Sequence, residues 1–136
     1  MTPLPPKHKF SETSKKRLDT CHTDLQRVFY EVVKQFDCSI LDGHRGKERQ
    51  NAYFRARKSK KQWPNSKHNT YPSLAVDVAP YPIDWDDLER FRYFAGYVMG
   101  IAHSMGIRLL WGGDWDGDTD LKDQTFNDLC HFELIT

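Results

Sequence analysis

Apolar residues recur at helical spacing in two stretches of the chain. In residues 23–36 this spacing predicts an amphipathic helix, and His22-Thr23-Asp24 supplies a capping signal at its start. A longer helix is predicted from Asp84, as its N-cap, to about Met105, with Gly106 ending it. The apolar positions are Leu25, Val28, Phe29, Val32, Val33 and Phe36 in the first helix, and Trp85, Leu88, Phe91, Ala95, Val98, Ala102 and Met105 in the second.

Short apolar or alternating stretches predict strands at residues 38–41, 74–79 and 107–111 and around Phe132. With the two helices they predict an α+β fold, in which a small antiparallel sheet packs against the helices on one face and carries the functional site on its open face. In residues 74–79, Asp77 shares its face only with alanines, whereas Val76 and Val78 point to the other face. A carboxylate in such a strand is costly to bury unless it is paired or holds a metal ion.

Length and composition predict one globular domain over residues 1–136, with residues 1–9 as a loose, proline-containing tail. The chain has 20 basic and 19 acidic residues, so the whole molecule has no strong attraction to nucleic acid or to a membrane surface. No stretch has the apolar length of a signal peptide core or a membrane span. The cysteines, Cys21, Cys38 and Cys130, are odd in number and form no Cys-x-x-Cys pair, which argues against disulfides and a thiolate zinc site.

Three residues are candidate metal ligands. His68 and Asp77 lie on either side of a turn, and His131 shares its predicted strand face with Glu133. Two imidazoles and one carboxylate, with a fourth position left to water, are typical of catalytic zinc, whereas structural sites close with four ligands that usually include thiolates. We therefore predict a zinc site on His68, Asp77 and His131. The alternative is a capping or loop histidine and a buried, hydrogen-bonded aspartate.

The segments that carry these residues resemble a known family. Ser66-x-His68, Pro72-Ser73-Leu74-Ala75-Val76-Asp77 and Asp128-x-x-His131-Phe132-Glu133-Leu134 are similar to motifs of the D-alanyl-D-alanine carboxypeptidase and L-alanyl-D-glutamate endopeptidase family of zinc peptidases, particularly its small phage endolysins. The resemblance covers about residues 10–134 and implies the fold that these peptidases share with hedgehog domains, one catalytic zinc ion and peptidoglycan as substrate. It also implies that Asp128, three residues before the last histidine, is the catalytic acid and base, and that Arg45 contacts substrate.

Other residues near these motifs are expected to support the site. The Ser66 hydroxyl is a candidate partner for His68, and Glu133 is expected to orient His68 or His131, or else to replace Asp128 as the proton carrier. Cys130 should point away from His131 across the strand, so we expect a core or supporting thiol rather than a fourth ligand. For Arg45, the alternative is a solvated arginine in a turn.

Two charged segments are candidates for further binding. Positive charge gathers at Arg55, Arg57, Lys58, Lys60 and Lys61, next to Tyr53, Phe54 and Trp63. This segment is either a solvated face or a patch for a polyanion, for which an anionic cell-wall polymer is a better partner than DNA.

The second segment is an acidic loop with Asp114, Asp116, Asp118, Asp120 and Asp123. It departs from an EF-hand at Thr119, where glycine is required, and at Thr125, where a carboxylate is required. It is therefore either a hydrated loop or a Ca²⁺ site of another kind.

Taken together, these features predict a zinc-dependent peptidoglycan peptidase, specifically a phage endolysin that cleaves the L-alanyl-D-glutamate bond of the stem peptide. The alternatives are a D-alanyl-D-alanine carboxypeptidase, a zinc-bearing cell-wall-binding module without catalysis, and, more remotely, a metal-dependent nuclease. We expect a monomer that is made in the host cytoplasm and reaches the wall once the inner membrane has been permeabilised.

Overall fold

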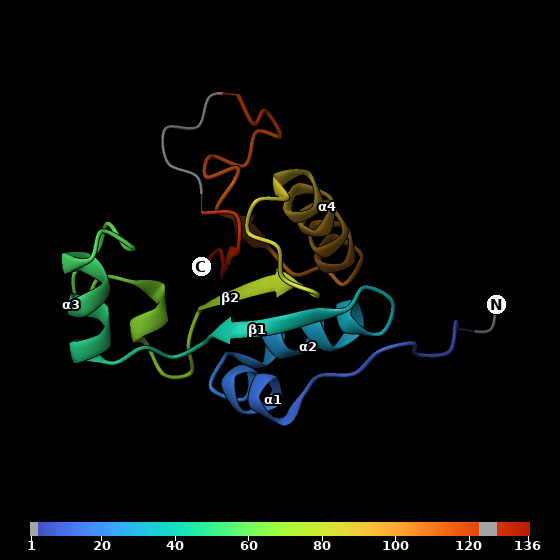
Figure 1. Ribbon diagram of the computed structural model, residues 1–136, viewed down its shortest axis with the longest axis horizontal. Coiled ribbons are helices and arrows are strands. Elements are labelled where there is room, and N and C mark those ends of the chain that lie inside the picture. The colour runs from blue at the N-terminus through green and yellow to red at the C-terminus, as the bar shows by residue number, and fades with distance from the viewer. Residues whose placement is uncertain (1–2, 123–127) are drawn as a thin grey trace.

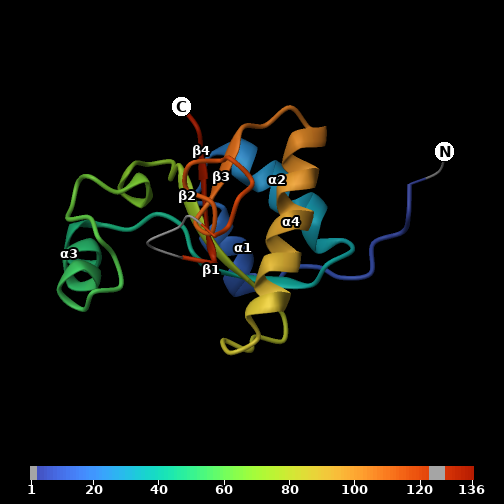
Figure 2. The same cartoon turned by 90° about the horizontal axis from the view of Figure 1, so that it is seen from above.

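The computed structural model describes residues 3–122 and 128–136, and it confirms the predicted α+β fold. Strands β1 (Cys38–Asp42), β2 (Ala75–Pro80), β3 (Leu109–Trp111) and β4 (His131–Leu134) form a four-stranded sheet in the order β1-β2-β4-β3. Every neighbouring pair is antiparallel. Helices α2 (Thr23–Val33) and α4 (Leu88–Ser104) cover one side of the sheet, and α1 (Glu12–Leu18) packs against β1 (Figure 1). Helix α3 (Lys47–Arg55) lies on the other side (Figure 2).

The core lies between the sheet and the two covering helices. Helix α2 buries the predicted stripe, and its N-cap is His22, whose Nδ1 accepts the Asp24 backbone N–H at 3.0 Å. Phe29 meets Phe132 of β4 edge to face, with ring centroids 5.4 Å apart. The helix ends at Val33, before the predicted end. The apolar face of the sheet is thus filled, so the polar face is left for the site.

The start of α4 differs from the prediction. Asp87, not Asp84, is the N-cap, and its side chain accepts the Arg90 backbone N–H at 3.1 Å. Asp84 instead accepts from Asp86 in a turn before the helix. Trp85, predicted to be buried, is therefore exposed and stacks on Phe91 from outside. On α4 itself Leu88 was predicted to be buried but is exposed, and Phe94, for which no prediction was made, is buried.

Strand pairing brings the polar residues of β2 and β4 to one place. In the antiparallel register Asp77 lies opposite His131 and Ala75 lies opposite Glu133. Between β1 and β2 the register shifts after Ile40, so that Asp42 also pairs with Asp77. Within residues 3–122 and 128–136, no helix combines the length and apolar character needed to cross a membrane.

Candidate active site

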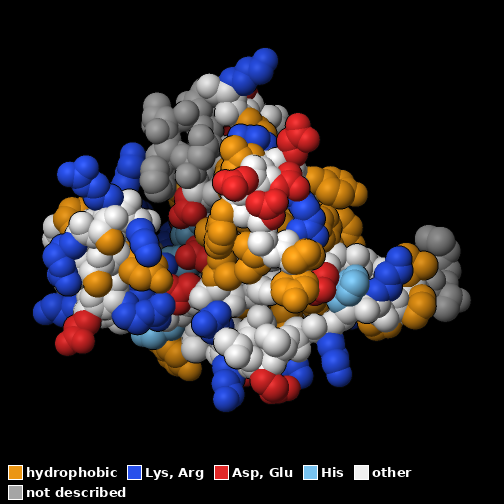
Figure 3. Space-filling view, viewed as in Figure 1, with side chains coloured by type: hydrophobic (Ala, Val, Ile, Leu, Met, Phe, Trp, Pro, Cys, Tyr) orange, Lys and Arg blue, Asp and Glu red, His pale blue; other side chains and the backbone are white. Residues whose placement is uncertain are grey.

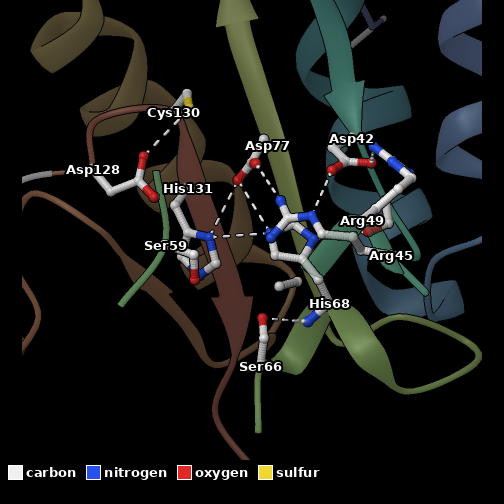
Figure 4. A network of polar contacts seen from close by, with 12 residues as sticks. Asp42, Arg45, Arg49, Ser59, Ser66, His68, Asp77, Asp128, Cys130 and His131 are labelled. Atoms are coloured by element: carbon white, nitrogen blue, oxygen red, sulfur yellow. Dashed lines mark hydrogen bonds and ion pairs between the residues drawn. The ribbon is translucent and has the colours of Figure 1, made fainter. Parts of the chain in front are cut away.

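The three predicted ligands converge from three elements. His68 comes from the short helix η1 (Lys67–Asn69), Asp77 from the middle of β2 and His131 from the first position of β4 (Figure 4). The Nε2 atom of His68 lies 3.3 Å from Nδ1 of His131. The Oδ1 atom of Asp77 lies 3.2 Å from that same nitrogen of His131 and 3.3 Å from Nε2 of His68. Three donor atoms therefore form a nearly equilateral triangle.

This triangle matches the donor spacing of a tetrahedral zinc site. With metal–ligand distances of about 2.0 to 2.1 Å, two corners of the tetrahedron are about 3.3 Å apart. Mixed nitrogen and oxygen donors of this kind suit zinc. The residues present thus fit the ion that their sequence pattern predicts.

Backbone contacts fix the His68 ring. Ser66 is the N-cap of η1, and its hydroxyl accepts the His68 backbone N–H at 3.2 Å. Ser66 therefore supports His68 through the main chain and not through the imidazole. The ring nitrogen Nδ1 lies 2.7 Å from the Gly43 carbonyl oxygen, which can only accept, so Nδ1 carries the proton and Nε2 presents its lone pair to the site. A side chain on Gly43 would meet the Thr20 hydroxyl at 2.4 Å, so glycine is needed there.

His131 lies between two carboxylates. Its Nε2 atom is 2.8 Å from Oε1 of Glu133, and its Nδ1 faces Asp77. Burial alone would lower the pKa of His131, but hydrogen bonds with Asp77 and Glu133 outweigh it and raise the pKa to about 9. The Glu133 carboxylate is also 3.2 Å from Nζ of Lys67. Burial opposes ionisation of Glu133, yet His131 and Lys67 together hold its pKa below the usual value.

The two oxygens of Asp77 have separate partners. Oδ1 faces the two histidines, whereas Oδ2 lies 3.3 Å from Nη2 of Arg45. Burial would raise the pKa of Asp77, but the neighbouring imidazoles of His68 and His131 outweigh it and hold the pKa well below its ordinary range. The carboxylate is consequently ionised and aimed at the donor triangle.

Arg45 is buried, so the alternative of a solvated turn arginine is wrong. Its Nε donates to Asp42 at 2.9 Å, and its Nη1 donates to Oε1 of Gln50 at 2.9 Å. Its guanidinium also lies over the Tyr53 ring, 4.2 Å from the centroid. All three nitrogens of Arg45 therefore have partners, and one of these partners is Asp77.

Asp128 lies on the same cavity as the three candidate ligands. Burial, and next the negative charge of Asp77, raise its pKa above the ordinary value for aspartate. Its backbone N–H donates to the Gly112 carbonyl at 2.9 Å, and a Cβ on Gly112 would meet the Asp128 carbonyl oxygen at 2.1 Å. The Cys130 thiol lies 3.5 Å from Oδ1 of Asp128, and burial raises its pKa well above the usual range, so Cys130 is a neutral supporting group, not a thiolate.

The acidic loop forms a second, smaller cluster. Carboxylate oxygens of Asp114, Asp116 and Asp118 lie within 4.8 Å of one another. Asp120 is not part of that group, and Asp123 lies outside the described residues. The three side chains are half-buried or exposed, and acidic groups of this exposure are common without an ion, so calcium stays a prediction.

Gln50 is a residue of this region that the sequence did not single out. It is fully buried in α3, and its carbonyl oxygen accepts from Arg45 and from Asn69 of η1. In the sequence it stands in a strongly charged helix of weak amphipathic character, so no local pattern distinguishes it from a solvated glutamine. A glutamine between Arg49 and Asn51, two polar residues, gives no signal of burial.

Comparisons with known proteins find similar sequences and a similar fold. A family model described as phage L-alanyl-D-glutamate peptidase matches residues 7–135. The L-alanyl-D-glutamate peptidase of Escherichia phage T5 is 32% identical over 137 residues, which cover 93% of this chain and 98% of the phage protein. The crystal structure of the Serratia marcescens L-Ala D-Glu endopeptidase ChiX is similar with a TM-score of 0.75 and 27% identity, covering 95% of this chain and 92% of that one.

Proposed function

Because the chain belongs to the phage L-alanyl-D-glutamate peptidase family, we propose that it cleaves the L-alanyl-D-glutamate bond of peptidoglycan with zinc held by His68, Asp77 and His131. The observation that carries the metal assignment is the donor triangle, whose sides of 3.3, 3.2 and 3.3 Å match tetrahedral zinc. When bound, zinc acidifies water and polarises a peptide carbonyl. The remaining steps are assigned to side chains of the chain itself.

Asp128 is the proposed proton carrier. It takes a proton from the attacking water and passes it to the nitrogen of the departing D-glutamyl residue, so that the C–N bond breaks and a carboxylate and an amine form. A raised pKa suits this role, because a carboxylate that binds a proton more tightly is a better base. Glu133 is the weaker candidate, since its carboxylate is already engaged by His131 and Lys67.

Arg45 is proposed to act first as a positioning residue. It holds the oxygen of Asp77 that faces away from the two histidines, and thereby fixes the orientation of the other oxygen. Its positive charge lies on the wall of the cavity, where it also favours negative charge that develops on the carbonyl oxygen of the substrate.

The biological role that we propose is that of an endolysin, which degrades the wall of the host from within after the inner membrane has been permeabilised. Purified protein loaded with zinc should release stem peptides that carry a new D-glutamate amino terminus from peptidoglycan. Asp128→Asn is the matched inactive control. Release of free D-alanine without a new D-glutamate terminus would instead support carboxypeptidase activity.

A further inference from the structure

The cavity around the donor triangle is lined by lysines on one wall and by aromatic and acidic side chains on the other. It has a volume of about 1010 Å³ and is lined on one side by Lys58, Lys60 and Lys61, from the segment that follows α3. Trp85, Trp115 and Asp116 also line it, from the segment before α4 and the loop after β3. Figure 3 shows Lys and Arg side chains gathered over the α3 side of the hollow, and acidic side chains over the loop on the other side. The electrostatic potential in the cavity is therefore more positive at the lysine wall than at the wall formed by the acidic loop, and a charged ligand is oriented by this difference.

The lysine segment is fixed to the active site by Gln50. The Gln50 side-chain amide donates to the Lys61 carbonyl oxygen at 2.6 Å and to the Ser59 hydroxyl at 3.0 Å. The carbonyl oxygen of the same side chain accepts from Arg45, which in turn holds Asp77. One fully buried glutamine thus sets the position of the lysine backbone relative to the donor triangle.

Two exposed lysines of the cavity lining, Lys58 and Lys61, are candidates to bind an anionic group. Lys67 is already paired with Glu133 at 3.2 Å. Lys58 and Lys61 are exposed residues of the cavity lining, and the ammonium of Lys58 lies 5.8 Å from the centroid of the Tyr53 ring. An exposed ammonium on a fixed backbone is suited to bind a carboxylate of a substrate.

The substrate supplies such a carboxylate on one side of the scissile bond. A glutamyl residue has two carboxyl groups and the chain continues through only one of them, so the other stays ionised close to the scissile nitrogen. The alanyl residue on the other side contributes only a methyl group. The substrate thus carries its negative charge on the D-glutamyl side of the scissile bond only, as the cavity carries its lysine segment on one wall.

We propose that Lys58 and Lys61 form the subsite for the spare carboxylate of the D-glutamyl residue and so determine the direction in which the stem peptide lies across the site. The leaving D-glutamyl side faces the lysine wall, and the alanyl side faces Trp85 and Trp115. This inference rests on the proposed function, because it takes the bond that is cut as given.

The test compares two synthetic stem peptides that differ in one group. One has the free carboxylate on the D-glutamyl residue, and in the other that carboxylate is a primary amide. The values of kcat/KM are measured for the wild-type protein, for Lys58→Gln/Lys61→Gln, and for the control Lys9→Gln/Lys16→Gln, whose lysines are exposed far along the chain from the cavity segment. All measurements use zinc-loaded protein at low and at high salt.

The wild-type protein is expected to prefer the acid peptide roughly twofold to thirtyfold, as two exposed charge pairs allow, with the difference in KM and not in kcat. This preference should become smaller at high salt, because salt screens the charge pairs. It should disappear in Lys58→Gln/Lys61→Gln, and the control Lys9→Gln/Lys16→Gln should keep it. An unchanged preference in the cavity variant, or an equal loss on both peptides, would overturn the subsite. So would a variant that keeps the preference but loses binding to whole cell walls, since the lysines would then serve a wall polymer.

The two proposals fail in different ways. If the wild-type protein cleaves both peptides equally well, the subsite is wrong and the peptidase function stands. If it cleaves neither peptide, the proposed function is wrong and the subsite falls with it.

Discussion

Glu133 gives the sharpest test of how the metal site is built. Its Oε1 atom lies 2.8 Å from Nε2 of His131, and its side chain is only 11% exposed. A carboxylate in this place keeps the proton of His131 on Nε2 and leaves Nδ1 to bind a metal ion. The substitution Glu133→Gln keeps the size and an acceptor oxygen but removes the negative charge.

The expected loss is in zinc affinity. Removing such a partner of a ligating histidine costs about tenfold to a hundredfold in metal affinity. The remaining amide oxygen of Gln still accepts the proton of Nε2, so we expect the lower part of this range, about tenfold, or about 1.4 kcal/mol. Loss of the ion pair between Glu133 and Lys67, whose atoms are 3.2 Å apart, works in the same direction, because it frees a positive charge near the cation.

The measurement is a zinc competition titration against a chromophoric chelator at pH 7. The matched control is Glu31→Gln, which breaks a Glu–Lys pair with a 3.0 Å contact on the exposed surface of α2. Circular dichroism of the metal-free proteins checks that both variants are folded. The reasoning is refuted if folded Glu133→Gln binds zinc as tightly as the wild-type protein, or if the control weakens zinc equally.

Four further predictions address the same site. Asp128→Asn should lower kcat by about 10²- to 10⁴-fold while metal analysis still finds one zinc, and a wild-type rate would remove Asp128 from its role. Arg45→Lys should weaken zinc binding, because one ammonium cannot reach all three partners of the guanidinium; a raised KM with unchanged zinc affinity would instead indicate direct substrate contact. The raised pKa of His131 stabilises the folded, metal-free protein by on the order of 3 kcal/mol. This contribution is fully present below pH 6.5 and is lost as the pH rises through about 9. Urea unfolding measures it, and a free energy of unfolding that does not change over this pH range would contradict it. For residues 114–118, calorimetry that detects no heat with millimolar calcium would exclude a calcium site.

Local patterns in the sequence were sufficient to predict the fold class, whereas the three candidate ligands were predicted from residue types together with the family resemblance, and the structure brings these three residues together. Alternation along β2 separates Asp77 from Val76 and Val78, and that separation holds in any sheet whose apolar face is buried. The start of α4 was predicted wrongly because Asp84 and Asp87 are equally good caps in a local sense. In the structure Asp87 is the cap, so the helix begins after Trp85, which lies outside the core.

The supporting residues could not be predicted, since their roles arise from contacts between distant segments. Gly43 matters because its carbonyl meets His68, 25 residues later, and because its Cα lies against Thr20. Gly112 breaks a strand in the sequence, but in the structure it makes room for the carbonyl of Asp128. Neither partner is visible from the residues that flank the glycine.

The sheet core, and not the metal ion, determines which way the ligands point. Phe132 lies between His131 and Glu133 in β4, is fully buried, and meets the rings of both Phe29 and Phe94. Because strand side chains alternate, burial of Phe132 forces both of its neighbours onto the opposite face. A slip of one residue in the register would place the His131 imidazole in the core and the Phe132 ring beside Asp77. The same apolar contacts that stabilise the fold therefore hold the donor triangle in place, and for this reason the imidazoles and the carboxylate converge even where each alone is costly to bury.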